Sequence, residues 1–221
     1  MVSALIFANG DLNDGPAVRS ALEIAPPRLV IAVDGGLRHV QTCGLQPDLV
    51  VGDMDSVDPT WLSAAHEHGA EILRYPAHKN ETDLELALIA AAKRDCETIR
   101  IIGAVGDRLD QTFGNVFLLA LSVLHPLLKR RDTRLVSGKQ TIWLAYPGQN
   151  VIDGAPGDTV SLIPLNETVT NIVTEALEYP LRGEILRFGP ARGISNVMLT
   201  TQALVEYQSG LLLIIHTVGR A

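Results

Sequence analysis

The sequence predicts an α/β protein with two domains: an N-terminal doubly wound, mostly parallel sheet domain and a C-terminal antiparallel β-sandwich domain. Two observations support this. Up to about residue 130, short β-branched runs alternate with helical patterns, as in a parallel sheet covered by helices. Beyond Arg131, short alternating segments follow one another, separated by Gly, Pro and Asp. We place the boundary near Asp132, which gives domains 1–132 and 133–221.

The predicted elements of the first domain follow from apolar runs and helical spacing. Strands are expected at residues 4–8, 29–33, 49–51, 71–74 and 98–102, with 134–136 as a sixth candidate. Helices are expected at 16–24, 37–42, 59–68, 83–94 and 111–124, each with apolar residues at helical spacing. In the second domain, strands are expected at 142–146, 159–164, 169–174, 185–188, 196–200, 204–208 and 211–217.

Composition excludes several classes of protein. With 221 residues and 47% apolar residues, the chain can bury a core and is not intrinsically disordered. Its longest apolar runs are far shorter than the roughly 20 residues that span a bilayer. A net charge of −7 argues against a nucleic-acid partner. Cys43 and Cys96 have no CxxC partner, so reduced thiols are expected. The start of the sequence has no basic flank and no apolar region of secretory length, so a cytoplasmic protein is expected.

Acidic residues follow the predicted strands of the first domain. They stand in the segments VDGG (33–36), GDMDS (52–56), KNETD (79–83) and GAVGDRLD (103–110). Parallel strands place their carboxyl ends at one edge, where ligands of open α/β sheets bind. Such a density of like charges is costly unless a cation completes it, and Mg²⁺ commonly combines one or two carboxylates with substrate phosphates. A magnesium–nucleotide site is therefore predicted from the set of carboxylates, although a single Asp here is more often a turn or helix-cap residue.

Individual residues in these segments suggest roles. Asp53 and Asp55 are two residues apart, so in an extended segment they point the same way and could share an ion. Thr82 to Glu85 fits a capping box, which places Asp83 in the first turn of a helix. Lys79 could reach phosphate oxygens. The loop 103–110 resembles neither a dinucleotide fingerprint nor a P-loop, and Arg108 and Asp110 read either as ligand contacts or as a local ion pair.

Taken together, the motifs resemble those of thiamine pyrophosphokinases. The segments VDGG (33–36), PDLVVGDMDS (47–56), KNETDLE (79–85) and GAVGDRLDQ (103–111) match that family in order and spacing. In the second half, GDTVSLIPL (157–165), LEYPL (177–181) and GISN (193–196) are similar to its thiamine-binding β-sandwich. The resemblance covers nearly the whole chain.

The resemblance implies an enzyme that transfers the diphosphate of ATP to the hydroxyl of thiamine, giving thiamine diphosphate and AMP. It also implies a homodimer with active sites at the subunit interface. Mg²⁺ would be held by Asp53, Asp55 and Asp83. ATP would be contacted by Asp34, Lys79 and Arg108, with Gly35 and Asn80 among the binding residues. Asp110 and Gln111 would face thiamine, and Ser195 and Asn196 would close its pocket. Catalysis would rest on the carboxylates Asp53, Asp55, Asp83 and Asp110, and Asp83 or Asp110 would accept the hydroxyl proton.

Two alternatives remain open from the sequence. The chain departs from the family pattern at Asp107, where the family often has Gly, and at Val197, where it often has Glu. Trp143 is followed by no further Trp that could stack on thiamine. A metal-dependent transferase or hydrolase with a different acceptor is one alternative. A thiamine or nucleotide sensor without turnover is the other, which the complete set of carboxylates and Lys79 disfavours.

Overall fold

The computed structural model describes residues 2–125 and 131–220, and these form two compact units, Met1–Gly138 and Lys139–Ala221. The division lies a few residues beyond the boundary expected at Asp132. The reason is the strand β6 (Asp132–Ser137), which pairs in parallel with β5 (Cys96–Ile102) of the first unit. Within the described residues, no helix is long and apolar enough to cross a membrane.

The first unit alternates strands and helices as expected. Its other strands are β1 (Val2–Phe7), β2 (Arg28–Val33), β3 (Leu49–Gly52) and β4 (Glu71–Arg74). Its helices are α1 (Pro16–Leu22), α2 (Leu37–Thr42), α3 (Pro59–Glu67), α4 (Asp83–Lys93) and α5 (Leu109–Phe117), with 3₁₀ turns η1 (Asp34–Gly36), η2 (Leu118–Ala120) and η3 (Ser122–Leu124).

The strand order of this unit creates a switch point in the sheet. The order is β6-β5-β1-β2-β3-β4, and each neighbouring pair is parallel. The chain runs outward from β1 to β4 and then returns to β5 on the other side of β1. In doubly wound sheets the ligand crevice opens at this reversal, beyond the carboxyl ends of the strands. The doubly wound parallel sheet predicted from the sequence is confirmed.

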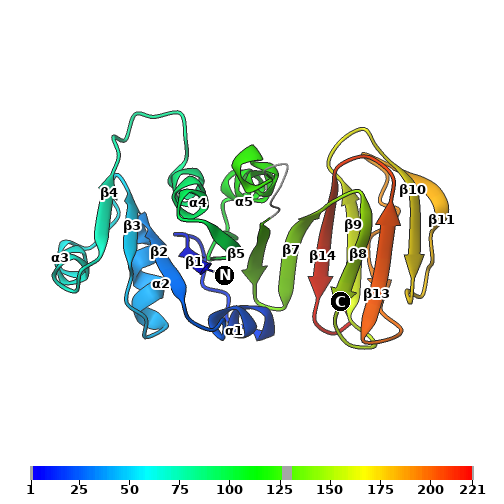
Figure 1. The fold of residues 1–221 in the computed structure, drawn as a ribbon, viewed down its shortest axis with the longest axis horizontal. Helices are drawn as coiled ribbons and strands as arrows, with labels where there is room; N and C mark the ends of the chain where they lie inside the picture. The colour runs from blue at the N-terminus through cyan, green and yellow to red at the C-terminus, as the bar shows by residue number, and fades with distance from the viewer. Residues whose placement is uncertain (1, 126–130, 221) are drawn as a thin grey trace. The chain divides into compact units, whose positions relative to one another are not determined.

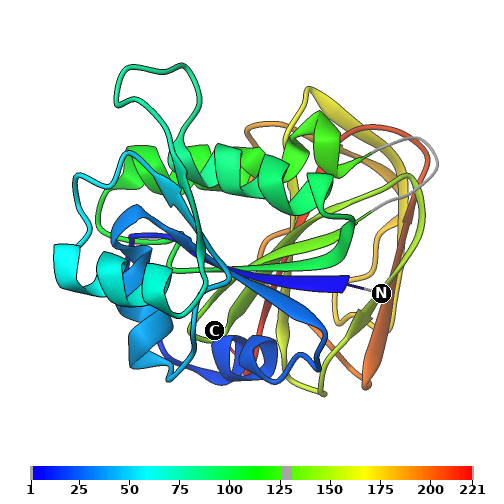
Figure 2. The same cartoon turned by 60° about the vertical axis from the view of Figure 1, so that its left-hand side comes forward.

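Helices cover both faces of this sheet (Figures 1 and 2). On one face, Phe7 and Ala32 of the strands share a buried cluster with Val18 of α1, Leu37 of α2 and Ala65 of α3. On the other face, α4 contacts β2, β3 and β5. Burial on both faces explains why these strands read as continuous apolar runs.

The helix expected at 111–124 is interrupted in the structure. The pattern from 111 to 124 predicted a single helix, but α5 ends at Phe117 and two 3₁₀ turns follow. The chain is extended at Leu121, where φ is −59° and ψ is 125°, and this interrupts the helix. The apolar spacing continued because the 3₁₀ turns also bury apolar residues, Leu119 and Leu124.

The second unit is a sandwich of two antiparallel sheets. Its strands are β7 (Gln140–Ala145), β8 (Gly148–Asp153), β9 (Thr159–Pro164), β10 (Thr168–Glu175), β11 (Arg182–Arg187), β12 (Asn196–Val197), β13 (Gln202–Tyr207) and β14 (Leu212–Thr217). Strands β12-β9-β14-β7 lie side by side in that order as one antiparallel layer, and β11-β10-β13-β8 form a separate four-stranded sheet. Leu162 and Ile214 of the first sheet share a buried core with Ile172 and Val205 of the second. The predicted β-sandwich is confirmed.

Candidate functional site

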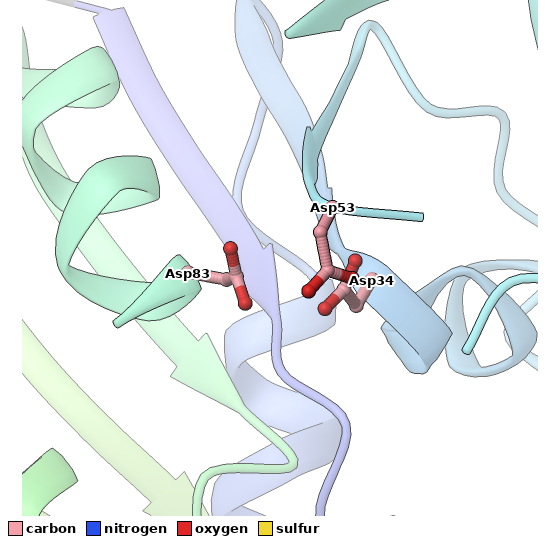
Figure 3. Close-up of side chains that lie close together, drawn as sticks. All are labelled: Asp34, Asp53 and Asp83. Carbon is pink, nitrogen blue, oxygen red and sulfur yellow. The ribbon is translucent and has the colours of Figure 1, made fainter. Parts of the chain in front are cut away.

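Three carboxylates of the first unit lie together at the carboxyl edge of its sheet. Asp34 follows β2, Asp53 follows β3, and Asp83 begins α4. One carboxylate oxygen of each lies within 4.8 Å of the others, and Figure 3 shows the three groups turned toward one another. Segments distant in the sequence therefore supply one cluster of hard oxygen donors, of the kind that suits a divalent cation.

The backbone around Asp34 is built to hold its carboxylate in place. Asp34 has φ 46°, in the left-handed region that non-glycine residues rarely adopt. Its Oδ1 accepts a hydrogen bond from the Met54 N–H at 3.1 Å. A Cβ at Gly52 would overlap Asp34 Oδ1, and one at Gly36 would overlap the Phe7 carbonyl. Glycine at position 52 allows the loops after β2 and β3 to approach each other, and glycine at position 36 allows the loop after β2 to approach the end of β1.

The environment makes Asp34 a weak acid. Burial is the main cause, and the nearby Asp83 and Asp53 carboxylates add repulsion, against the opposing effect of the Met54 N–H. The pKa of Asp34 rises from 3.8 to about 6. A positive charge in this cluster would reverse the repulsive part of that shift.

Lys79 supplies a positive charge to the cluster. Its Nζ lies 3.0 Å from Asp83 Oδ1 and also donates to the Pro76 carbonyl at 3.2 Å. The Lys79 and Asp83 side chains are only 11% and 22% exposed. The Asp83 carboxylate, assisted by Asp53 and Asp34, raises the pKa of Lys79 despite partial burial. Lys79 is therefore charged at neutral pH.

The position of Asp83 is fixed by its helix. Thr82 is the N-cap, and its hydroxyl accepts the Glu85 N–H at 3.2 Å, which confirms the predicted cap. Leu84, Ala87 and Leu88 are buried beneath the first turns. Asp83 thus stands at a helix N-terminus, where a negative charge is also favoured by the helix dipole.

A second wall of the site is formed by the loop 103–108 and α5. Thr112 Oγ1 lies 3.2 Å from both the N–H and the carbonyl oxygen of Gly106. Asn115 Nδ2 donates to the Ala104 carbonyl at 2.8 Å. These two side chains of α5 hold the loop against the helix that follows it.

These elements enclose a cavity of about 470 Å³, a size typical of small-ligand sites. The cavity brings together six of the residues singled out from the sequence. These are Asp34, Asp53, Lys79, Asp83, Arg108 and Gln111.

Four other residues of the first unit that were expected at the site are not among the described residues that line the cavity. Asp55 is exposed, because Met54 has φ 70° and the segment is therefore not extended as expected from the sequence. The Asp55 N–H instead donates to Asp53 Oδ1 at 3.0 Å. Asp110 pairs with the exposed Arg108. Gly35 is buried and donates its N–H to Ser56 Oγ, and Asn80 is exposed.

Of the two residues of the second unit that were expected to close the pocket, Ser195 and Asn196, one is exposed and the other is buried. Ser195 is exposed and has φ 59°. Asn196 is buried, and its amide spans the backbone of Tyr179: Oδ1 accepts the Tyr179 N–H at 3.0 Å, and Nδ2 donates to its carbonyl at 2.7 Å. Asn196 therefore shapes a hollow of about 240 Å³, which it lines together with Tyr179, Pro180 and Ile194.

Several other residues that line the cavity were not predicted from the sequence. Asn9 and Gly10 follow β1, and Thr112 and Asn115 lie on α5. Asn9 and Gly10 could have been found by the same rule that selected Asp34 and Asp53, since they also follow a parallel strand. Thr112 and Asn115 carry no such signal, because their role depends on which side of α5 faces the loop.

Comparison with known proteins identifies the family. Residues 22–128 match the model of the thiamin pyrophosphokinase catalytic domain, and residues 149–212 match the model of the thiamin pyrophosphokinase vitamin B1 binding domain. The chain belongs to the thiamin pyrophosphokinase family. The family recognised from the motifs, and with it an enzyme of this type, is confirmed.

Individual members of the thiamin pyrophosphokinase family show the extent of the similarity. The thiamine pyrophosphokinase of Bacillus subtilis (strain 168) is 27% identical over 190 residues, which cover 86% of this chain and 87% of the relative. The crystal structure of the Bacillus subtilis enzyme has a TM-score of 0.84 at 24% identity and covers 99% of each chain. A family protein from Enterococcus faecalis has a TM-score of 0.83 at 26% identity and covers 97% of this chain and 98% of its own. Thiamine pyrophosphokinase 2 of Arabidopsis thaliana is 28% identical, and the match spans 64% of its length.

Proposed function

We propose that this chain transfers the diphosphate of ATP to the hydroxyl of thiamine, giving thiamine diphosphate and AMP. One observation carries the proposal: in a chain of this family, a single cavity joins the carboxylates Asp34, Asp53 and Asp83 to the cations Lys79 and Arg108. Phosphoryl transfer depends on positioning and charge neutralisation more than on a covalent intermediate, and these residues can supply both.

Mg²⁺ is the proposed metal. The donors fit it, since carboxylate oxygens converge from three separate segments of the chain and the buried Asp83 Oδ1 has an ion pair with Lys79 but no hydrogen-bond partner among the described residues. When bound, Mg²⁺ neutralises phosphate charge. Asp53 and Asp83 would hold it, and Asp34 is a structural candidate beside the Asp55 indicated by the motif.

The chain's own residues would orient the substrates. Lys79 and Arg108 would contact phosphate oxygens, with Asp34 and Asn80 as further ATP contacts. Gln111 would face the acceptor. Of the two carboxylates considered for the hydroxyl proton, Asp83 lines the cavity, whereas Asp110 is exposed and pairs with Arg108, whose guanidinium lowers the pKa of Asp110.

We also propose that the protein is a cytoplasmic homodimer in which the partner's second unit completes the thiamine pocket. Leu109, Phe113 and Phe117 recur every four residues on α5 and are 67%, 58% and 57% exposed, as at a protein interface. In the second unit, Tyr179 is 63% exposed beside the hollow near Ser195 and Asn196, and it could stack on the acceptor. Cys43 and Cys96 are both free thiols, which suits a reducing compartment.

The central test is a product assay. Purified protein is incubated with ATP, Mg²⁺ and thiamine, and the products are separated by chromatography. We expect thiamine diphosphate and AMP in equal amounts. AMP without thiamine diphosphate would indicate hydrolysis or another acceptor, and binding of both ligands without AMP would indicate a sensor; either result refutes the proposal.

Variants test the metal ligands. Asp53→Asn should lower kcat by at least about 100-fold, because it removes a carboxylate that would hold Mg²⁺, and the metal would otherwise neutralise the phosphate charge. Asp95→Asn is the matched control: Asp95 lies between α4 and β5, and its φ of 55° is one that Asn tolerates. Comparing Asp34→Asn with Asp55→Asn decides the third ligand, since only a ligand's replacement should also raise the Mg²⁺ concentration needed for half-maximal rate.

A further inference from the structure

We propose that Lys79 is the counter-ion of the carboxylate cluster and competes with the divalent cation for Asp83, so that cation binding releases Lys79 toward the polyphosphate. This inference rests on the proposed function, because it gives one side chain two partners at the same site. It concerns the order of charge exchange at that site and does not depend on which alcohol accepts the diphosphate.

The geometry places Lys79 directly on a cluster oxygen. Its Nζ is 3.0 Å from Asp83 Oδ1, an atom that is buried and, apart from this ion pair, has no hydrogen-bond partner among the described residues. Asp34 and Asp53 each offer an oxygen within 4.8 Å of an Asp83 oxygen. A cation shared by these carboxylates would therefore lie close to the ammonium group.

Electrostatics makes the two positive charges exclude each other. A divalent cation and an ammonium a few ångströms apart repel strongly in a partly desolvated site. The ammonium can move at little cost, because Lys79 has a flexible stem and its second contact is with Pro76, only three residues away. The Pro76 contact can persist while Nζ leaves Asp83 for a phosphate oxygen.

The consequence is a measurable penalty on metal binding when no nucleotide is present. Lys79 neutralises part of the cluster and must be displaced, so removing its charge should strengthen cation binding. If Lys79 served only to support its loop, its removal would weaken cation binding or leave it unchanged. The two roles therefore predict opposite signs.

The experiment measures binding of Mn²⁺ alone to the full chain by electron paramagnetic resonance, without ATP or thiamine. Lys79→Met should bind Mn²⁺ at least about tenfold more tightly than the original chain. Lys79→Arg, which keeps the charge, should remain within about twofold, as should the control Lys93→Met, since Lys93 lies in the last turn of α4. Equal or weaker Mn²⁺ binding by Lys79→Met overturns the proposal.

A thermal readout provides an independent check. In EDTA, Lys79→Met should unfold at a lower temperature, because three carboxylates lose their counter-charge. Saturating Mn²⁺ should then raise its midpoint by more than it raises that of the original chain. A smaller rise would overturn the proposal. Neither measurement uses a substrate. The proposed role of Lys79 can therefore be refuted while the product assay supports the proposed function, and the proposed function can be refuted while the role of Lys79 is supported.

Discussion

Replacing Asp34 with Asn should stabilise the first unit at neutral pH in the absence of divalent cations. The pKa of Asp34 rises from 3.8 to about 6, chiefly through burial. One pKa unit corresponds to about 1.4 kcal/mol, so the ionised carboxylate costs the folded state at most about 3 kcal/mol. Partial exposure screens that cost, and we expect about 1–2 kcal/mol. The amide oxygen of Asn can still accept the Met54 N–H, so the loop keeps its hydrogen bond.

The sign of the pH dependence follows from proton binding. Between the unfolded value near 3.8 and the folded value of about 6, the folded state binds more protons, so stability falls as the pH rises through this window. Asp34→Asn should abolish that part of the slope.

The assay is urea denaturation in EDTA from pH 4 to pH 7.5, followed by circular dichroism, with Asp95→Asn as control. If the free energy of unfolding of Asp34→Asn is no larger than that of the original chain at pH 7.5, or if the difference does not grow with pH, the ionised Asp34 carboxylate does not destabilise the folded state and the reasoning is refuted.

Three further predictions concern other parts of the chain. Thr112→Val removes the hydroxyl that holds Gly106 and should cost about 1 kcal/mol and raise the KM for ATP, measured by steady-state kinetics; an unchanged KM would separate the loop from the nucleotide. Phe113→Glu should convert a dimer into a monomer by light scattering while helicity is retained, because Phe113 is 58% exposed; a wild-type monomer would contradict the proposed dimer. Burial alone would raise the pKa of Asp158, but its carboxylate accepts hydrogen bonds from the Gly219 and Ala155 N–H groups and pairs with His216. Together these contacts lower the pKa of Asp158 below 3.8. Stability of the second unit should therefore be lost as the pH falls below about 3.8, and Asp158→Asn should cost about 1–3 kcal/mol at neutral pH and flatten that acid limb; an unaltered acid limb would contradict the assignment.

Most of the architecture could be predicted because burial leaves a clear pattern. Strands buried on both faces, such as β1 and β2, give unbroken apolar runs. Strand β8 was not predicted because its sequence GQNVID is rich in turn formers and buries only Ile152. It forms nonetheless because it pairs with β13 along its whole length, a contact that no local pattern reveals.

The site was predictable to the extent that strand ends define it. Asp34, Asp53 and Asp83 follow from the rule that parallel strands place their carboxyl ends at one edge. Asp55 did not behave as alternation implied, because one left-handed residue, Met54, turned the chain. The buried role of Asn196 depends on a partner 17 residues away, and such partnerships are not visible in a single sequence.

The two helices that bound the cavity are anchored to very different degrees. Seven of the eleven residues of α4 are buried, whereas none of the nine residues of α5, all of which the structure describes, is buried. Local opening requires little free energy where little apolar surface is lost, so the backbone amides of α5 should exchange with deuterium well before those of α4. A ligand that contacts Gln111 should therefore slow the deuterium exchange of the α5 amides, whereas the exchange rates of the α4 amides should hardly change and can serve as an internal reference.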